Sequence, residues 1–214
     1  MRIRFDEQLK QLNKEMINMG TMIEKSIGDA VKALMKQDVE IAQKVMAGDE
    51  EIDRTERKIE DLCLRLLLQQ QPVARDLRNI SAALKMVTDM ERIGDHATDI
   101  SELAIVLSEK TYVKKLDHIE EMARETMVML IQSLEAYVEK DLDKAQKVIA
   151  HDDVIDDLFE EVKQELIELI RNHADEGEQA VDLLMVTKYF ERIGDHATNI
   201  AEWVIFSITG QIAG

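Results

Sequence analysis

Hydrophobic residues recur at steps of three and four positions along most of this chain, which is the spacing of one face of an α-helix. The first segment shows the pattern most regularly, at Phe5, Leu9, Leu12, Met16, Met19, Ile23, Ile27, Ala30 and Leu34. The lone proline, Pro72, cannot continue a helix interior, and aspartates stand where N-caps belong at positions 38 and 141. These features predict six helices, over about 5–37, 38–70, 73–108, 114–140, 141–172 and 178–207.

Two blocks of sequence occur twice. The octapeptide ERIGDHAT spans residues 91–98 and again residues 191–198, one hundred positions later. The segment DVEIAQKVMAGDEEID at 38–53 aligns with DLDKAQKVIAHDDVID at 141–156, with nine of sixteen residues identical. Self-similarity at a fixed period indicates a duplicated structural unit. We therefore expect an all-α fold of two tandem antiparallel three-helix bundles related by internal duplication, over residues 1–110 and 111–214.

Composition agrees with a helical protein and restricts its partners. The chain has only one Pro and eight Gly, and its 27 Lys and Arg against 44 Asp and Glu give a net charge of −17. That charge repels nucleic acid and anionic lipid, and it favours cations or basic protein surfaces as partners. The amino terminus lacks the apolar run of a signal peptide, and no charge-free segment approaches the ~20 residues that span a bilayer. We expect a soluble cytoplasmic protein that does not insert directly into the membrane, with the single Cys63 in its core.

The repeated octapeptide places acids on one face of a helix. At 100° per residue, Glu91, Asp95 and Asp99 lie within 80° of one another, whereas the apolar positions of the same helix lie on the opposite side. The second copy gives Glu191 and Asp195 the same geometry, but its third position is the neutral residue Asn199. Carboxylates one turn apart repel each other, so the stripe needs a compensating partner.

The preceding helix of each copy supplies a second pair of acids. Counting residues from the hairpin turns near positions 73 and 175 puts these pairs at the same height as the stripes on antiparallel neighbours. Two clusters of about five oxygen donors each are predicted, from Asp49, Asp53, Glu91, Asp95 and Asp99, and from Asp152, Asp156, Glu191, Asp195 and Asn199. Such donors suit hard cations, or iron, manganese or zinc, and could bridge more than one metal. The alternative interpretation is a solvated charged face without an ion.

The other repeated residues favour structural roles. His96 and His196 lie off the acidic face and are expected to pack or to form hydrogen bonds rather than to bind metal. Gly94 and Gly194 stand in mid-helix, where each costs ~1 kcal/mol relative to Ala, which indicates a close approach of another backbone.

The chain resembles the PhoU family over its whole length. The resemblance rests on the duplicated six-helix plan, on the segment QQQPVARDLR at 69–78, and on the two correctly spaced ERIGDHA blocks. It implies two three-helix bundles with pseudo-twofold symmetry, and multinuclear metal clusters on paired acidic motifs. Those motifs fall on the two sets of acids named above, with iron first among the expected metals and zinc or another divalent cation as alternatives. Asn199 departs from the acidic pattern, so the second cluster is the weaker prediction.

The resemblance also implies a function. PhoU-like proteins are negative regulators of phosphate uptake and of the phosphate-starvation response, acting between the phosphate ABC transporter and a sensor histidine kinase. We expect a non-catalytic homodimer that binds the transporter's ATPase subunit and the kinase, with peripheral placement at the inner face of the membrane through the transporter. Two alternatives stay open, a carboxylate-based metal store and a metallohydrolase-like enzyme.

Overall fold

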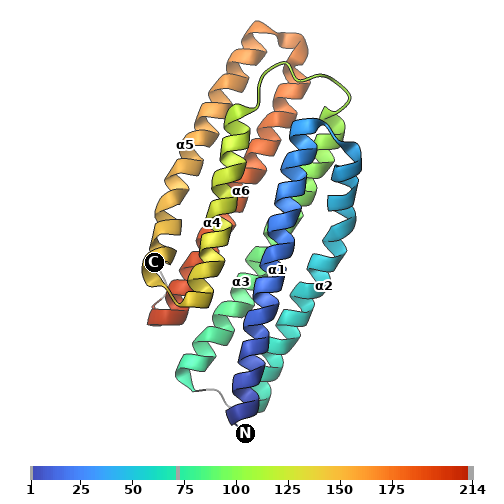
Figure 1. Ribbon diagram of the computed structural model, residues 1–214. Helices are drawn as coiled ribbons and strands as arrows, with labels where there is room; N and C mark the ends of the chain where they lie inside the picture. The colour runs from blue at the N-terminus through green and yellow to red at the C-terminus, as the bar shows by residue number, and fades with distance from the viewer. Residues whose placement is uncertain (1, 71–72, 212–214) are drawn as a thin grey trace.

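Six long α-helices make up the protein, and no strand occurs within the described residues (Figure 1). The computed structural model describes residues 2–70 and 73–211. The helices are α1 (Arg2–Lys36), α2 (Val39–Gln70), α3 (Ala74–Leu107), α4 (Asp117–Glu139), α5 (Leu142–Asn172) and α6 (Gly177–Thr209), with a short 3₁₀ turn, η1 (Ala174–Glu176), before α6. The six helices predicted from the hydrophobic pattern are confirmed. Pro72, predicted to separate the second and third, lies outside the described residues.

Equivalent residues begin and end helices in the two halves. The side chain of Asp38 accepts a hydrogen bond from the backbone N–H of Ile41 at 3.1 Å, and Asp141 does the same for Lys144 at 2.9 Å. The residue before each turn, Gln37 and Lys140, adopts a left-handed conformation with φ of 54° and 56°. Both predicted N-caps are therefore confirmed, and the offset of 103 residues holds across the first two helices of each half.

Each half is a three-helix bundle, and the two bundles pack side by side. Within the first half α1, α2 and α3 all contact one another, as do α4, α5 and α6 in the second. The halves meet mainly through α3 and α6, with a smaller contact between α1 and α4 (Figure 1). The ERIGDHAT copies thus lie on the two central helices.

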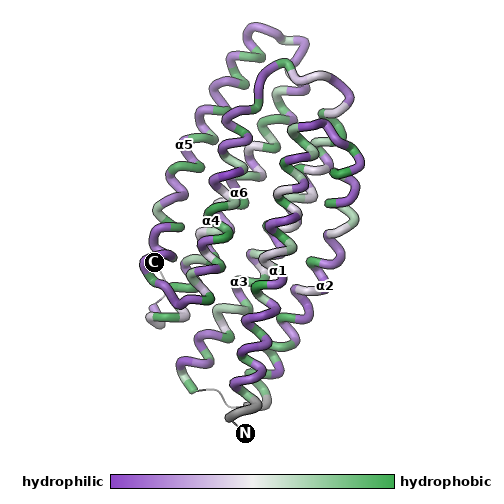
Figure 2. Tube along the Cα trace, in the orientation of Figure 1, coloured by the Kyte–Doolittle hydropathy of each residue, from purple (hydrophilic) through white to green (hydrophobic). Residues whose placement is uncertain are grey.

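A single hydrophobic core runs through both halves. The buried side chains of this core are apolar and come from all six helices. Figure 2 shows hydrophobic and hydrophilic residues alternating along each helix. The predicted core face of the repeat is confirmed, since Ile93, Ala97 and Ile100 are fully buried. Cys63 is also fully buried, and burial raises the pKa of its thiol to about 12, as expected for an inert core residue. Among the described residues, no helix has the length and apolarity needed to cross a membrane.

Candidate metal site

Three carboxylates from two helices converge in the first half. Asp49 and Asp53 on α2 and Asp95 on α3 each offer an oxygen, and these three oxygens all lie within 4.8 Å of one another. All three side chains are half-buried in the seam between the helices. The structure therefore brings together the DxxxD pair and the repeated aspartate, as hairpin counting predicted.

Glu91 borders this trio and Asp99 lies at its edge. Burial and then the charge of Asp95 raise the pKa of Glu91, and Asp53 and Asp49 add to the shift. Asp99 instead bonds to the ring of His96, with 3.2 Å between its Oδ2 and Nδ1. All five predicted donors thus interact electrostatically, and Asp99, the most distant in its effect on Asp49, is hydrogen-bonded to His96.

Glu56 is a sixth acid at this site, which the sequence analysis missed. Burial raises the pKa of Glu56 to about 7, with further contributions from Glu91, Glu60 and Asp53. A signal existed, because Asp49, Asp53 and Glu56 follow one another at steps of four and three on one helix face. Glu56 is not repeated in the second copy, where the aligned residue is Phe159.

The protein compensates this concentration of charge only in part. Arg92 pairs with Asp95 at 2.9 Å, and Arg57 pairs with Asp53 at 3.2 Å, both from exposed positions. Burial first, and then the charges of Asp95 and Asp53, raise the pKa of Asp49. Exposed ion pairs contribute little to stability, so the acids remain mutually repulsive.

The donor set fits a hard cation. Oxygen ligands of Ca²⁺ lie at 2.3–2.6 Å, so two oxygens on one ion are separated by at most ~5 Å, a limit that the trio satisfies. The hydroxyl oxygen of Thr98 is buried beside Asp49, where it opposes the rise in the pKa of that carboxyl, so a further oxygen lies at the edge of the trio. A cation would offset the repulsion that the helix pair otherwise retains. The carboxylate-only chemistry of the trio suits magnesium, calcium or manganese, and carboxylate-rich sites in helical bundles also hold iron.

The second half gathers its equivalent acids less tightly. Burial raises the pKa of Asp152 to about 6, followed by the charges of Asp195 and Asp156, so these residues do face one another. Asp156 and Asp195 are exposed, unlike their half-buried counterparts Asp53 and Asp95. Within the described residues no second trio meets the distance criterion satisfied in the first half.

A lysine occupies the second site. Lys188 Nζ lies 2.5 Å from Glu191 Oε1 and packs over the ring of Phe159, 5.4 Å from its centroid. The first half has Thr88 and Glu56 at these positions. Where one half places an additional acid, the other therefore places a cation on an aromatic ring. Charge neutralisation by this lysine is a second reason, besides Asn199, to expect weaker metal binding there.

Asn199 is engaged across the contact between the halves. Its amide donates a hydrogen bond to Asp89 on α3 at 3.1 Å, and Asp89 also bonds to His196 at 2.8 Å. Asp89 thereby holds the side chain of Asn199 toward α3.

Both repeated histidines lie in the contact between α3 and α6. Their ring centroids are 5.6 Å apart, and His96 also stacks on Tyr189 at 5.5 Å. Burial lowers the pKa of His96, so its neutral form is favoured. The prediction that these histidines pack and form hydrogen bonds is confirmed.

The repeated glycines approach side chains rather than backbone, which corrects the sequence prediction. A Cβ atom on Gly94 would lie 3.2 Å from two side-chain atoms of Ile52, and one on Gly194 would lie 3.3 Å from Asp152 Oδ1. The small residue therefore lets α2 come close to α3, and α5 close to α6. This closeness is what brings acids on the paired helices within reach of one another.

Comparison with known proteins identifies relatives over nearly the whole chain. The sequence model of the PhoU domain matches residues 16–104 and again residues 119–204. A phosphate-specific transport system accessory protein PhoU homolog from Clostridium acetobutylicum is 40% identical over 208 residues, which covers 97% of this chain and 95% of the relative. A homolog of the same name from Caulobacter vibrioides is 36% identical, and the match covers 97% of this chain and 90% of the homolog.

Solved structures have the same fold. The crystal structure of PhoU from Pseudomonas aeruginosa superimposes with a TM-score of 0.93 at 33% identity, over 97% of this chain and 100% of the other. The phosphate transport system regulatory protein PhoU from Streptococcus pneumoniae gives a TM-score of 0.91 at 26% identity, over 98% and 99% of the two chains.

Proposed function

Because this chain belongs to the PhoU family, we propose that it is a negative regulator of phosphate uptake and of the phosphate-starvation response. In this proposal it has no catalytic turnover. It acts as a metal-binding adaptor between the ATPase subunit of the phosphate ABC transporter and a sensor histidine kinase. The names of its relatives, phosphate-specific transport system accessory proteins, support the link to phosphate transport.

The observation that carries the metal-binding part is the convergence of Asp49, Asp53 and Asp95 from two helices. The mutual repulsion of these acids opposes their convergence, and a bound cation would offset that repulsion. We propose that these residues, with Glu91 and Asp99, bind one or more cations, with iron first and zinc or another divalent ion as alternatives. Asp152, Asp156, Glu191, Asp195 and Asn199 form the weaker second site.

The metallohydrolase alternative gains no support from the site. A metallohydrolase needs a base or activated water near its metal, and the two repeated histidines instead face each other between α3 and α6. A metal store requires no protein partner, whereas an adaptor does. Binding of a partner protein therefore distinguishes the store from the adaptor.

A binding assay with purified proteins tests the adaptor proposal. The wild-type chain, immobilised in metal-loaded and chelator-treated forms, should capture the ATPase subunit and the kinase, with stronger capture when loaded. The variant D49N/D53N/D95N should retain the helical signal and lose the metal dependence. The matched variant D152N/D156N/D195N should lose less of it. Absence of capture under every condition would contradict the adaptor proposal and leave the metal store.

The cellular placement follows from these partners. We propose a homodimer in the cytoplasm that joins the inner face of the membrane through the transporter. Analytical ultracentrifugation at micromolar concentration tests the dimer, and a monomer at every concentration would contradict it.

A further inference from the structure

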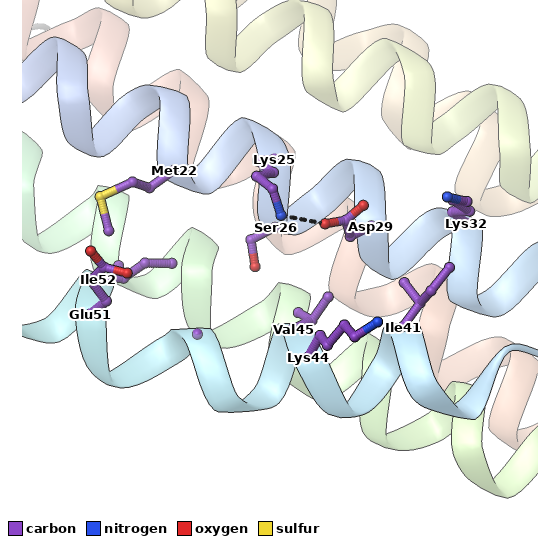
Figure 3. Close-up of a pocket in the computed structure, with 11 residues that line it drawn as sticks. Met22, Lys25, Ser26, Asp29, Lys32, Ile41, Lys44, Val45, Glu51 and Ile52 are labelled. Carbon is purple, nitrogen blue, oxygen red and sulfur yellow. Dashed lines mark hydrogen bonds and ion pairs between the residues drawn. The ribbon is translucent and has the colours of Figure 1, made fainter.

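A groove of about 420 Å³ lies between α1 and α2 of the first half (Figure 3). Ile41, Val45 and Ile52 form an apolar floor on α2, on a face adjacent to the one that bears the acids. The volume is within the range of roughly 300–1,000 Å³ that small-molecule sites occupy. The groove is separate from the metal site and has no part in the function proposed above.

Positive charge is concentrated at this groove in a strongly acidic protein. Lys25 and Lys32 on α1 and Lys44 on α2 line it, against two acids, Asp29 and Glu51. Asp29 is already paired with Lys25, at 2.7 Å (Figure 3). The lining thus has a net charge of +1, three lysines less two acids, in a chain of net charge −17.

Gly48 keeps the groove open without any packing reason to be glycine. A Cβ atom at this position would meet nothing within 4 Å, in contrast to the close contacts at Gly94 and Gly194. Glycine in a helix interior costs roughly 0.5–1 kcal/mol relative to Ala. The visible effect of this residue is the open space beside it.

The duplicated half shows what closes such a groove. At the offset of 103, Gly48 corresponds to His151 and Met22 corresponds to Glu125. The ring of His151 reaches from α5 to Glu125 on α4, with 2.9 Å between Nε2 and Oε2, and so crosses the equivalent space. The same alignment replaces Lys32 by Glu135. Lys44 keeps a counterpart in Lys147, so the second half differs from the open groove by the bridge and the acid rather than by every lysine.

We propose that the groove of the first half binds an organic polyphosphate of the size of a nucleoside triphosphate. Lysines are point-charge donors suited to phosphate oxygens, and Lys25 and Lys32 are seven residues apart, or ~10 Å along the helix. Lys32 on α1 and Lys44 on α2 line the groove from both helices, Lys25 adds charge beside its partner Asp29, and Ser26 on the same wall adds a hydroxyl donor. The apolar floor accommodates the organic part, which a lone inorganic phosphate lacks.

Titration calorimetry on the full-length, metal-free protein at low salt tests this proposal. ATP should bind at least tenfold more tightly than AMP, which has fewer charges, and more tightly than tripolyphosphate, which has no apolar part. Citrate tests polycarboxylates and inorganic phosphate tests single anions, and both should bind at least tenfold more weakly than ATP. Equal affinity for ATP and either of these anions would overturn the assignment, and so would no ATP binding at millimolar concentration.

Exchanging the bridge between the halves locates the binding. The double substitution M22E/G48H transfers the closing pair into the groove and should weaken ATP binding at least tenfold. The reciprocal control E125M/H151G opens the second half and should leave the affinity of the first groove unchanged. Unaltered binding in M22E/G48H, or an equal loss in both variants, would overturn the proposal. If M22E/G48H does not fold, the variant K32Q/K44Q, at two exposed positions, replaces it. The same tenfold loss of affinity for ATP is expected.

Discussion

Replacing Asp49 by Asn should stabilise the metal-free protein and destabilise the metal-loaded one. Asp49 faces Asp95 and Asp53, and burial and these charges raise its pKa. Within the described residues Asp49 forms no ion pair. Each repulsion between neighbouring carboxylates costs a few tenths of a kcal/mol. The substitution removes repulsion from Asp53 and Asp95 and the cost of partly burying a charge. The free energy of unfolding should therefore rise by ~0.5–1 kcal/mol.

Thermal unfolding after chelator treatment measures this gain. For a chain of this size ~1 kcal/mol shifts Tm by roughly 2–4 °C, so Asp49→Asn should raise Tm by about 1–4 °C at low salt and by less at 0.5 M NaCl. With saturating divalent metal the order should reverse, because ligand binding stabilises only the state that binds it.

The neighbouring acid Glu50 provides the control. It is exposed and paired with Arg54 at 3.0 Å, so Glu50→Gln removes an ion pair rather than a repulsion and should lower Tm slightly in both states. A loss of stability for metal-free Asp49→Asn would mean that Asp49 is paired structurally, and an unchanged order in metal would mean that it is not a ligand. Either result would refute the reasoning.

Three further predictions concern charge and packing. The pKa of Glu56 is raised from 4.5 to about 7 in the folded protein, so the metal-free protein should gain stability as pH falls from 8 to 5.5, by about 1 kcal/mol after allowance for solvent screening. Glu56→Gln should flatten this pH dependence of Tm, and an unchanged slope would contradict the role of Glu56. Lys188→Thr should raise the metal content of the second half, measured by mass spectrometry of equilibrated protein, because it frees Glu191; lower or equal content would count against the role of the lysine. Gly48→Ala should raise Tm. Gly94→Ala should not, because the new methyl group would crowd Ile52 and overpacking costs ~1–3 kcal/mol. An equal rise in Tm for both variants would show that Ile52 moves freely.

The fold and half of the site follow from periodicity and duplication. The steps of three and four, the caps at Asp38 and Asp141 and the repeat specified six helices and the pairing of α2 with α3, because these depend on local sequence. Counting from the hairpin placed Asp49 and Asp53 opposite Asp95, since antiparallel helices with one short turn have a fixed register.

What the sequence analysis missed depends on contacts between helices. Glu56 escaped notice because its counterpart is Phe159, and the engagement of Asn199 by Asp89 requires knowing that α3 lies against α6. The close approach at Gly94 was expected, but the neighbour proved to be the side chain of Ile52. Residues that differ between the copies therefore account for most of the structural difference between the two clusters.

Anomalous diffraction from crystals of protein purified without added metal tests the central claim most directly. A peak bounded by Asp49, Asp53 and Asp95 is expected, with Glu91 or Asp99 within reach, and a weaker peak or none near Asp152 and Asp195. The absorption edge identifies the element. Crystals soaked in iron, manganese and zinc that show no peak between α2 and α3 would contradict the metal site, as would a metal bound only elsewhere on the protein.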